Sequence, residues 1–321
     1  MTQTTGKLDH QPTAKTTNPL AAQATGAAQE AIKRKRLRQR VGQTLRRDPA
    51  AMIGLMILSI ILLMAILAPL LAPHDPGAVD PLKRLLPPFW IQPKGSPTYI
   101  LGTDAVGRDI LSRIIYGARV SLGVSLVSVI LSSLVGVTLG LLAGYYGRWI
   151  DAVIMRVVDI QLAYPLILFA ITIAAVFGAS LKNLIIVLVI ANWVTYTRIV
   201  RGEVLVRKRM QYVEAARVNG CRDGRIIRRH ILPNVFSSIL VIFTLQVAFV
   251  LILESGLSFL GLGVEPTIPT WGSMLNEGRT YIMTSWWVET FPGVAIMLAV
   301  LGINMLGDWI RDVLDPQLRV E

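Results

Sequence analysis

Residues 50–73 read AAMIGLMILSIILLMAILAPLLAP, a run without a single charged side chain. A helix of about 20 apolar residues crosses the ~30 Å hydrocarbon core of a bilayer, so this run predicts a membrane-spanning helix. A cleaved signal peptide is the alternative, but the run begins about fifty residues into the chain, is longer than an apolar signal core and has no Ala-x-Ala site. We therefore expect it to remain as an anchor.

Five more uncharged runs follow this first one along the chain. They are Val120–Gly147, Ile160–Leu181, Asn183–Thr197, Ile231–Leu253 and Thr290–Gly307. The run that begins at Asn183 is short, and it becomes long enough if Lys182 and Arg198 extend their charged ends toward the membrane surfaces. The pattern predicts an all-α integral membrane protein with six transmembrane helices.

The composition supports a membrane location and argues against several other classes of protein. The 321 residues are 53% hydrophobic and only 16% charged, which leaves too little polar surface for a soluble fold. The net charge of +12 could suggest nucleic acid as a partner, but a nucleic-acid site needs a solvated basic face. A single cysteine, Cys221, and three scattered histidines supply neither a disulfide nor a metal site.

The distribution of basic residues predicts the orientation in the membrane. With a cytosolic N-terminus and six spans, 24 of the 32 Lys and Arg residues lie on the cytosolic side and 8 on the outer side. Both termini should therefore be cytosolic, and the bias explains the basic charge without nucleic acid. Three tryptophans of the last outer loop, Trp271, Trp286 and Trp287, should then lie at the level of the lipid head groups.

The chain divides into three predicted parts. Residues 1–47 should form a disordered cytosolic tail whose basic cluster, Lys33–Arg47, marks the cytosolic side and could also contact anionic lipid. Residues 48–118 should hold the first transmembrane helix and an extracytoplasmic segment. Residues 119–316 should form a five-helix core, with a cytosolic loop at 201–233.

That loop carries the most informative pattern on the cytosolic side. Its first part spaces three apolar residues as on one helical face: Val206, Met210 and Val213. Gly220 should end this amphipathic helix, Asp223 should cap a second short helix, and Pro233 fits the first turn of the next span. Periodicity alone leaves two roles equally open, which are lying on lipid and docking to a partner protein.

The residues of the loop favour the docking role. The loop reads Glu214-Ala215-Ala216, then Gly220, then His230-Ile231-Leu232-Pro233, and it resembles the EAA loop of permeases in ATP-binding cassette importers. The resemblance implies a helix-turn-helix that docks into a groove of a cytosolic ATPase. It also implies that Glu214 and Gly220 fix the shape of the loop, while Ala215 and Ala216 permit close approach. The run at 229–234, Arg-His-Ile-Leu-Pro-Asn, looks like the peptide and nickel branch.

Other stretches resemble the C-type permease of dipeptide and oligopeptide importers, over roughly residues 45–319. They are Leu101-Gly102-Thr103-Asp104, Gly107-Arg108-Asp109, Ser112-Arg113, Gly117-Ala118-Arg119, Glu254-Ser255, residues 257–263, residues 271–275, Gly307-Asp308, Arg311-Asp312 and Leu314-Asp315-Pro316. Trp309 departs from the small residue common in relatives. The resemblance implies the type I permease fold of ABC importers.

The same resemblance implies a set of partners in a bacterial plasma (inner) membrane. These are a B-type permease subunit that completes a heterodimer, two ATPase subunits or one fused chain, and an extracytoplasmic solute-binding protein that delivers peptides. ATP and Mg would be bound by the ATPases, and this chain would need no cofactor. It contains neither a G-x-x-x-x-G-K-[ST] loop nor a G-x-S-x-G elbow, so we expect no enzyme activity and no catalytic residue. The cargo stays open among dipeptides, oligopeptides, nickel chelates, opines and glutathione.

A transporter driven by an ion gradient is the main rival. It would place ionisable residues deep in its helices, and Glu254 is the best candidate here. Because Glu254 lies near the outer end of the fifth span, we favour hydrogen bonding to a neighbouring helix or the outer loop. Three glycines at every fourth position, Gly136, Gly140 and Gly144, predict close helix packing, either within this subunit or against its partner. Pro165 should mark a helix boundary or a bend.

Overall fold

The computed structural model describes residue 45 and residues 48–91, 95–265 and 267–314. The chain divides into two units, Met1–Asp48 and Pro49–Glu321. The predicted tail and its basic cluster lie outside the described residues except for Leu45, as do Asp315 and Pro316. The second unit holds the helices that position the candidate site.

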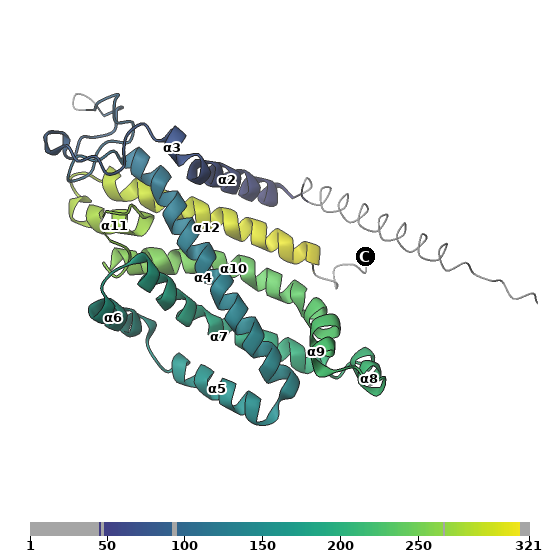
Figure 1. The fold of residues 1–321 in the computed structure, drawn as a ribbon. Helices are drawn as coiled ribbons and strands as arrows, with labels where there is room; N and C mark the ends of the chain where they lie inside the picture. Colours follow the sequence, from purple (N-terminus) through teal and green to yellow (C-terminus); the bar gives the residue numbers. More distant parts are fainter. Residues whose placement is uncertain (1–44, 46–47, 92–94, 266, 315–321) are drawn as a thin grey trace, which may run out of the picture. The chain divides into compact units, whose positions relative to one another are not determined.

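The described part of the second unit is built from helices, with one isolated bridge between Thr103 and Asp109. Five helices are long and apolar enough to cross a membrane: α2 (Pro49–Ile66), α4 (Ile110–Tyr146), α7 (Leu181–Arg207), α10 (Leu232–Phe259) and α12 (Trp287–Leu314) (Figure 1). Shorter helices connect them: α3 (Ala68–Leu71), α5 (Arg148–Leu162), α6 (Leu166–Phe177), α8 (Gln211–Val218), α9 (Asp223–Ile226) and α11 (Trp271–Gly278). The all-helical class expected from the sequence is confirmed.

The third predicted span, Ile160–Leu181, does not form one straight helix, because it contains the end of α5, a bend and all of α6. α5 and α6 meet at 83°, and the count of six spans is reached when this pair is taken as one. The bend lies at Ala163-Tyr164-Pro165, where Pro165 has no N–H to continue the helical ladder. Pro165 therefore marks the bend that its position in the run indicated.

α4 begins ten residues before the uncharged run that predicted it. It starts at Ile110, and the Asp109 side chain caps it by accepting from the Ser112 N–H at 3.0 Å. The predicted boundary between residues 118 and 119 is therefore wrong, because it falls inside this helix. The error arose from reading Arg113 as a charge outside the helix, whereas Arg113 is buried within its first turns.

Of the other long helices, α7, α10 and α12 also extend beyond their predicted runs, whereas α2 ends at Ile66, before Pro73. α7 continues to Arg207, beyond Val200, while Lys182 and Arg198 are exposed as their predicted positions required. α10 begins at Leu232 and holds Pro233 in its first turn, which confirms that expectation. α12 contains Pro292 within its second turn.

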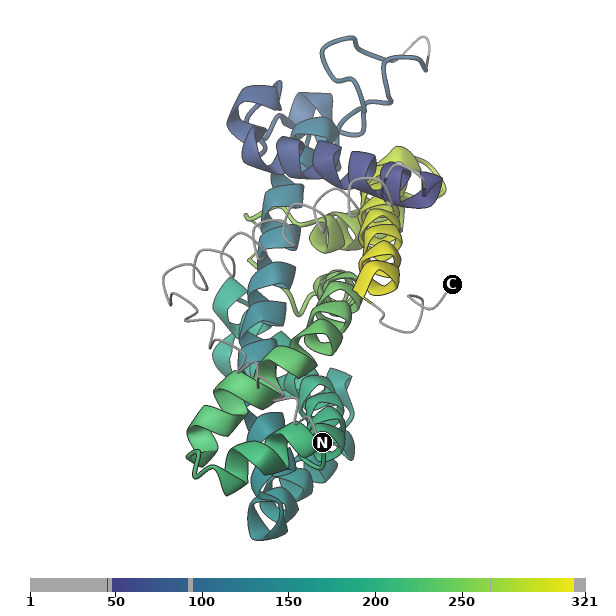
Figure 2. The same ribbon diagram turned by 90° about the vertical axis from the view of Figure 1, so that its right-hand side faces the viewer.

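The contact between α4 and α7 is the most extensive between two helices of the described chain (Figure 2). A Cβ atom built at each of the three spaced glycines would meet an α7 side chain: Tyr196 Cβ at 2.6 Å for Gly136, Val200 Cβ at 2.8 Å for Gly140 and Val204 Cβ at 2.7 Å for Gly144. These separations are too short for any side chain, so the backbones approach directly. The sequence left open whether these glycines pack within this subunit or against its partner, and they pack within this subunit.

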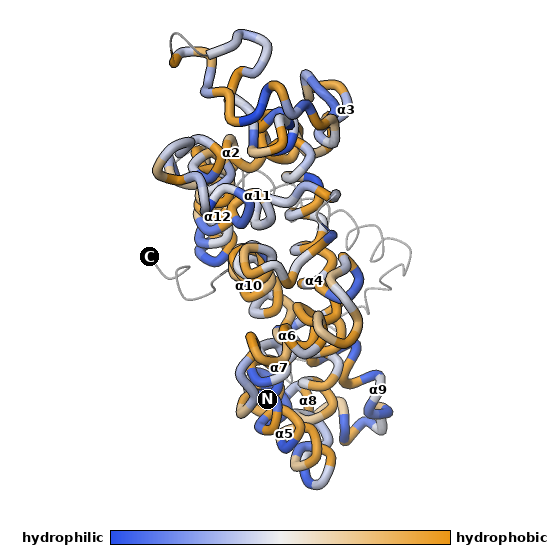
Figure 3. Tube along the Cα trace, turned by 90° about the vertical axis from the view of Figure 1, so that its left-hand side faces the viewer, coloured by the Kyte–Doolittle hydropathy of each residue, from blue (hydrophilic) through white to orange (hydrophobic). Residues whose placement is uncertain are grey.

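Much apolar surface on the long helices remains uncovered by the chain itself. Between 22% and 50% of each apolar window is buried, and the rest is available to lipid or to another subunit. Figure 3 shows hydrophobic residues along these helices and hydrophilic residues around α9. The polar loops that could carry function are therefore confined to the ends of the bundle.

Candidate functional site

The predicted coupling loop connects α7 to α10 and extends beyond the ends of both (Figure 1). After α7 ends at Arg207 a short turn leads into α8, and a second turn leads into α9. A π-helical turn, Ile227–Ile231, then joins α9 to α10. The loop is thus a helix, a turn and a second helix, as the sequence predicted.

α8 is attached to the bundle by one face. Val213 is 0% exposed and Ala216 8% exposed, and both belong to a hydrophobic cluster with residues of α7, α9 and α10: Val200, Val204, Ile226, Ile231 and Val235. The opposite face is exposed and carries Tyr212, Glu214, Ala215 and Val218. The two alanines implied to permit close approach are therefore divided, because Ala215 is accessible and Ala216 is part of the subunit's own core.

Gly220 ends α8 through a backbone conformation that favours glycine. Its φ is +73°, the Gly220 N–H donates to Arg217 O at 3.0 Å, and the Cys221 N–H donates to Ala216 O at 3.1 Å. These two bonds form a Schellman motif. A Cβ at Gly220 would meet no atom within 4 Å, so the surroundings leave room for a side chain. Glycine is favoured by the positive φ and not by crowding.

Asp223 does not cap α9 as predicted. Arg222 occupies the N-cap position without a side-chain bond, and Asp223 lies inside the first turn. Its carboxylate accepts a hydrogen bond of 2.6 Å from the hydroxyl of Tyr145, in the last turn of α4. Lys208 makes a second link by donating to Gly144 O at 2.7 Å. The loop is therefore tied to the end of α4 through both of its turns.

The remaining predicted residues of the loop lie at the start of α10. His230 is half-buried in the π turn, and its carbonyl accepts from Asn234 Nδ2 at 2.6 Å. Leu232 packs against the hydrophobic cluster, while Pro233 is exposed. The predicted set is thus spatially continuous, but only Glu214, Ala215, Gly220 and Pro233 are exposed.

The charged side chains of the loop face outward. Among residues 211–233, all of which the structure describes, no ion pair is formed within the chain. The exposed charged residues are Glu214, Arg217, Arg222, Asp223, Arg225, Arg228 and Arg229. Such a mixed surface on a projecting helix pair suits contact with another protein.

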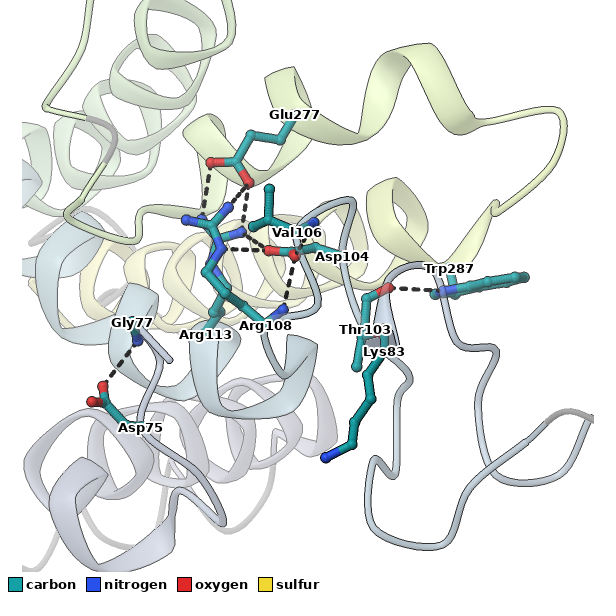
Figure 4. Close-up of polar contacts among 10 residues, drawn as sticks. All are labelled: Asp75, Gly77, Lys83, Thr103, Asp104, Val106, Arg108, Arg113, Glu277 and Trp287. Carbon is teal, nitrogen blue, oxygen red and sulfur yellow. Dashed lines mark hydrogen bonds and ion pairs between the residues drawn. The ribbon is translucent and has the colours of Figure 1, made fainter. Parts of the chain in front are cut away.

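A buried ion network lies at the opposite end of α4 (Figure 4). Asp104 accepts from the N–H groups of Val106 and Arg108 at 2.9 Å, from Arg108 Nε at 2.7 Å and from Arg113 at 2.5 Å. Glu277, on α11, accepts from Arg108 at 2.6 Å and from Arg113 at 2.5 and 3.0 Å. We call Asp104, Arg108, Arg113 and Glu277 the outer ion network, after the side of the membrane on which the sequence predicts it.

The outer ion network is electrostatically balanced. Burial opposes ionisation of the Asp104 carboxyl, but the charges of Arg113 and Arg108 hold its pKa below the usual range. In the sequence, Asp104, Arg108 and Arg113 were noted only as part of a resemblance, and Glu277 was not noted at all. Their partnership escaped notice because Arg113 and Glu277 are 164 positions apart. The available signal was a pair of arginines, Arg108 and Arg113, directly before an apolar run.

The tryptophans of the outer loop do not share one environment. Trp271 is 0% exposed and donates its indole N–H to Ile114 O at 3.0 Å, so its predicted position at the head groups is wrong. Trp287 is also buried and donates to Thr103 O at 3.4 Å (Figure 4). Trp286 is 41% exposed. Trp271 is buried because it is the first residue of α11, and α11 packs against α4 and α10.

Glu254 is fully buried close to this junction. Its carboxyl group accepts hydrogen bonds from Ser258 at 2.9 Å and from Ser255 at 3.3 Å on its own helix, and Ser121 of α4 lies beside it. Ser121 in turn accepts from the Trp271 N–H at 3.2 Å. The hydrogen bonds of Glu254 are thus within α10, and the bonding to a neighbouring helix or the outer loop that we favoured stays a prediction.

Comparison with known proteins places this architecture in a family. Residues 136–320 match the binding-protein-dependent transport system inner membrane component, and residues 36–88 match the N-terminal TM domain of oligopeptide transport permease C. The dipeptide transport system permease protein DppC of Alkalihalophilus pseudofirmus is 44% identical over 86% of this chain and 88% of its own length. The glutathione transport system permease protein GsiD of Pectobacterium atrosepticum is 42% identical over 86% of this chain and 89% of its own length.

A solved structure supports the fold independently. The MetNI methionine ABC transporter, in an inward-facing conformation, aligns with a TM-score of 0.52 and 18% identity. The alignment covers 63% of this chain and 96% of that chain. At this identity the likeness concerns the fold alone, and it matches the type I importer permease fold expected from the sequence. The chain therefore belongs to the inner-membrane permease subunits of binding-protein-dependent ABC importers, in the branch that carries the N-terminal domain of oligopeptide transport permease C.

Proposed function

We propose that this chain forms half of a pathway for dipeptides or oligopeptides across the bacterial inner membrane. A B-type permease completes the pathway, and an extracytoplasmic solute-binding protein delivers the cargo. The relatives support this choice of cargo, since they are named for dipeptide, di/tripeptide and glutathione transport. Glutathione is itself a small peptide, so all three names share one chemistry.

The exposed face of α8 is the observation that carries the coupling role. α8 is fixed to the bundle through Val213 and Ala216, while Glu214 and Ala215 point away from it. A short helix that is attached by one face can bind in a groove of an ATPase through its other face, without losing its contacts with the bundle. Closure of the ATPases would then move the loop together with the end of α4, through the bond between Asp223 and Tyr145.

In this mechanism the chain itself performs no covalent chemistry. ATP and Mg²⁺ are bound by two partner ATPases, or by one fused chain, and this subunit holds no cofactor. The loop must then face the cytosol, which agrees with the excess of basic residues between Arg198 and Arg229. Reporter fusions after Pro76 and Thr280 should report the outside, and fusions near Arg209 and Glu321 the cytosol. A cytosolic signal after Pro76 contradicts this orientation.

Charge reversal at Glu214 tests the coupling role. Because Glu214 is exposed and unpaired within the described chain, Glu214→Lys should leave folding and insertion intact while placing the wrong charge at the ATPase contact. The reconstituted importer should lose ATPase subunits or hydrolyse ATP without uptake. Glu265→Lys, at an exposed outer position, is the matched control and should behave as the wild type. Normal uptake by Glu214→Lys would remove the main support for this role.

The energy source separates an ATP-driven importer from an ion-coupled transporter. At constant ATP, a protonophore should leave uptake into proteoliposomes unchanged, and an inactive ATPase partner should abolish it. The reverse dependence would favour an ion-coupled mechanism, in which Glu254 would be the first residue to examine.

A further inference from the structure

A cavity of about 570 Å³ lies at the bend between α5 and α6. Its size is within the range of small-molecule sites, about 300–1,000 Å³. It is lined by the end of α5, the bend, the start of α6 and one turn of α7: Ile160, Gln161, Leu162, Tyr164, Leu166, Phe169, Thr172, Ile190 and Ala191. Most of these side chains are apolar, and a few polar groups stand among them. The coupling loop and the outer ion network contribute nothing to this cavity.

One wall of the cavity is fixed by hydrogen bonds between α5 and α7. Trp193 donates its indole N–H to Gln161 Oε1 at 2.6 Å, and Gln161 Nε2 donates to Ile190 O. Gln161 is the residue before the last of α5, so these bonds hold the start of the bend against α7. The cavity is therefore a preformed feature of the fold and does not arise from a loose loop.

The bend places backbone polar groups within a predicted span. α5 ends at Leu162, and α6 begins at Leu166 without any side-chain cap. Such groups are tolerated at membrane depth only where protein or a water-filled cavity satisfies them. A lipid tail offers no hydrogen bond, whereas water and the main chain of a peptide offer both donors and acceptors. In secondary transporters, which are a different class of membrane carrier, interrupted spanning helices commonly border the solute site.

These observations together identify an occupant. Resting on the proposed function, we infer that this cavity is a subsite of the peptide pathway that receives an apolar side chain of the cargo. The cargo main chain faces the bend, and the side chain enters the space bordered by Phe169 and Ala191. The permease therefore contributes its own selection among peptides, in addition to that of the solute-binding protein.

A substitution that fills the cavity tests the inference. Ala191→Trp should reduce the uptake of peptides with Leu, Met, Phe or Tyr side chains by about tenfold or more relative to Gly and Ala peptides. The assay uses the complete importer in proteoliposomes, an equimolar mixture of dipeptides and tripeptides, and mass spectrometry of the vesicle contents. Ile186→Trp, on the same helix but outside the cavity, should leave the ratio unchanged. A uniform loss of all peptides, or no change, would overturn the inference.

A widening substitution gives the opposite result and avoids the risk of overpacking. Leu162 lines the cavity and is 55% exposed, so Leu162→Ala should fold normally. It should increase the share of peptides with Trp or Phe side chains among those imported. An unchanged share would contradict the subsite.

Accessibility distinguishes the cargo from other occupants. In a Cys221→Ser background, Thr172→Cys should react with a hydrophilic maleimide, and transported peptides should slow the reaction several-fold. Val176→Cys, on the same helix outside the cavity, should show no such protection. A Thr172→Cys side chain that never reacts in the assembled importer would show coverage by lipid or by the partner permease, and would overturn the inference. If the wild-type importer takes up no peptide at all, the proposed function fails first.

Discussion

The charged residues at the two ends of α4 lie in opposite environments. At the outer end, the charges of Asp104, Arg113 and Glu277 are neutralised inside the chain by bonds that join distant segments. At the other end, α8 is held by apolar contacts while its charged residues stay exposed and without ion partners in residues 211–233. The first end needs no other protein to satisfy its charges. The second end leaves its charges exposed, which suits the coupling surface that we propose.

Removing the central arginine of the outer ion network should produce the largest loss of stability. Arg113→Met leaves two carboxylates without their main partner in a buried site, and a buried ion pair broken in this way costs about 3–5 kcal/mol. Thermal unfolding in detergent should show the loss. Arg119→Met, exposed six residues later in the same helix, should melt as the wild type does. If both variants melt at the same temperature, the outer ion network stabilises the fold no more than an exposed charge does.

Adding one methyl group at the centre of the bundle should have a smaller effect. The Cβ of Gly136→Ala would lie 2.6 Å from Tyr196 Cβ, so α4 and α7 must separate, at a cost of about 1–3 kcal/mol. Gly123→Ala in the same helix meets no atom within 4 Å and should be neutral or stabilising by up to about 1 kcal/mol. If the two variants have the same unfolding midpoint in denaturant, α4 and α7 are not in close contact.

Substitution at the turn of the loop should separate coupling from folding. Gly220→Val places a β-branched residue at a φ of +73°, at a local cost of about 1–2 kcal/mol. Uptake should fall strongly, while membrane insertion and the melting temperature of the bundle change little. Gly224→Val, in the same loop but without a positive φ, is the control and should retain more uptake. Comparable uptake by both variants would show that the shape of this turn is unimportant.

The smallest expected effect is the response of the outer end to acid. Because the folded-state pKa of Asp104 is lowered, its ionised carboxylate stabilises the fold fully above the ordinary value of about 3.9. This stability is lost as the pH falls through the lower folded-state pKa. Fluorescence of the nearby Trp271 and Trp287 should therefore stay constant until the pH is well below 4. Asp104→Asn should be less stable and lack this transition, and an identical acid profile would contradict the assignment.

The long helices were predictable because membrane insertion depends on a local property. An apolar run such as Ala50–Pro73 carries its whole signal within one segment. The start of α10 at Leu232 was also predicted closely, although α9 and the π turn directly precede it. The end of the first loop helix at Gly220 was also predictable, since glycine is favoured where a helix ends before a second one.

The errors have a common cause in contacts between distant segments. Arg113 was read as a charge outside the membrane helix, because its partner Glu277 is not visible in the local sequence. Trp271 was assigned to the head groups by the same local reasoning, although α4 supplies an acceptor for its indole N–H. The bend at Pro165 was noted from sequence, but its size depends on packing against α7. The coupling role of Glu214 remains a prediction, because its partner lies in another chain.

The length of α4 has a mechanical consequence. With 37 residues it measures about 55 Å, so it exceeds the membrane core and reaches from the outer ion network to the Tyr145 contact with α9. A rod pivoting about its outer end by about 5° displaces its far end by about 5 Å, close to one helical turn. In the proposed orientation, a small rotation at the outer end of α4 and a turn-sized displacement at the end that contacts the coupling loop are thus one movement about a single pivot.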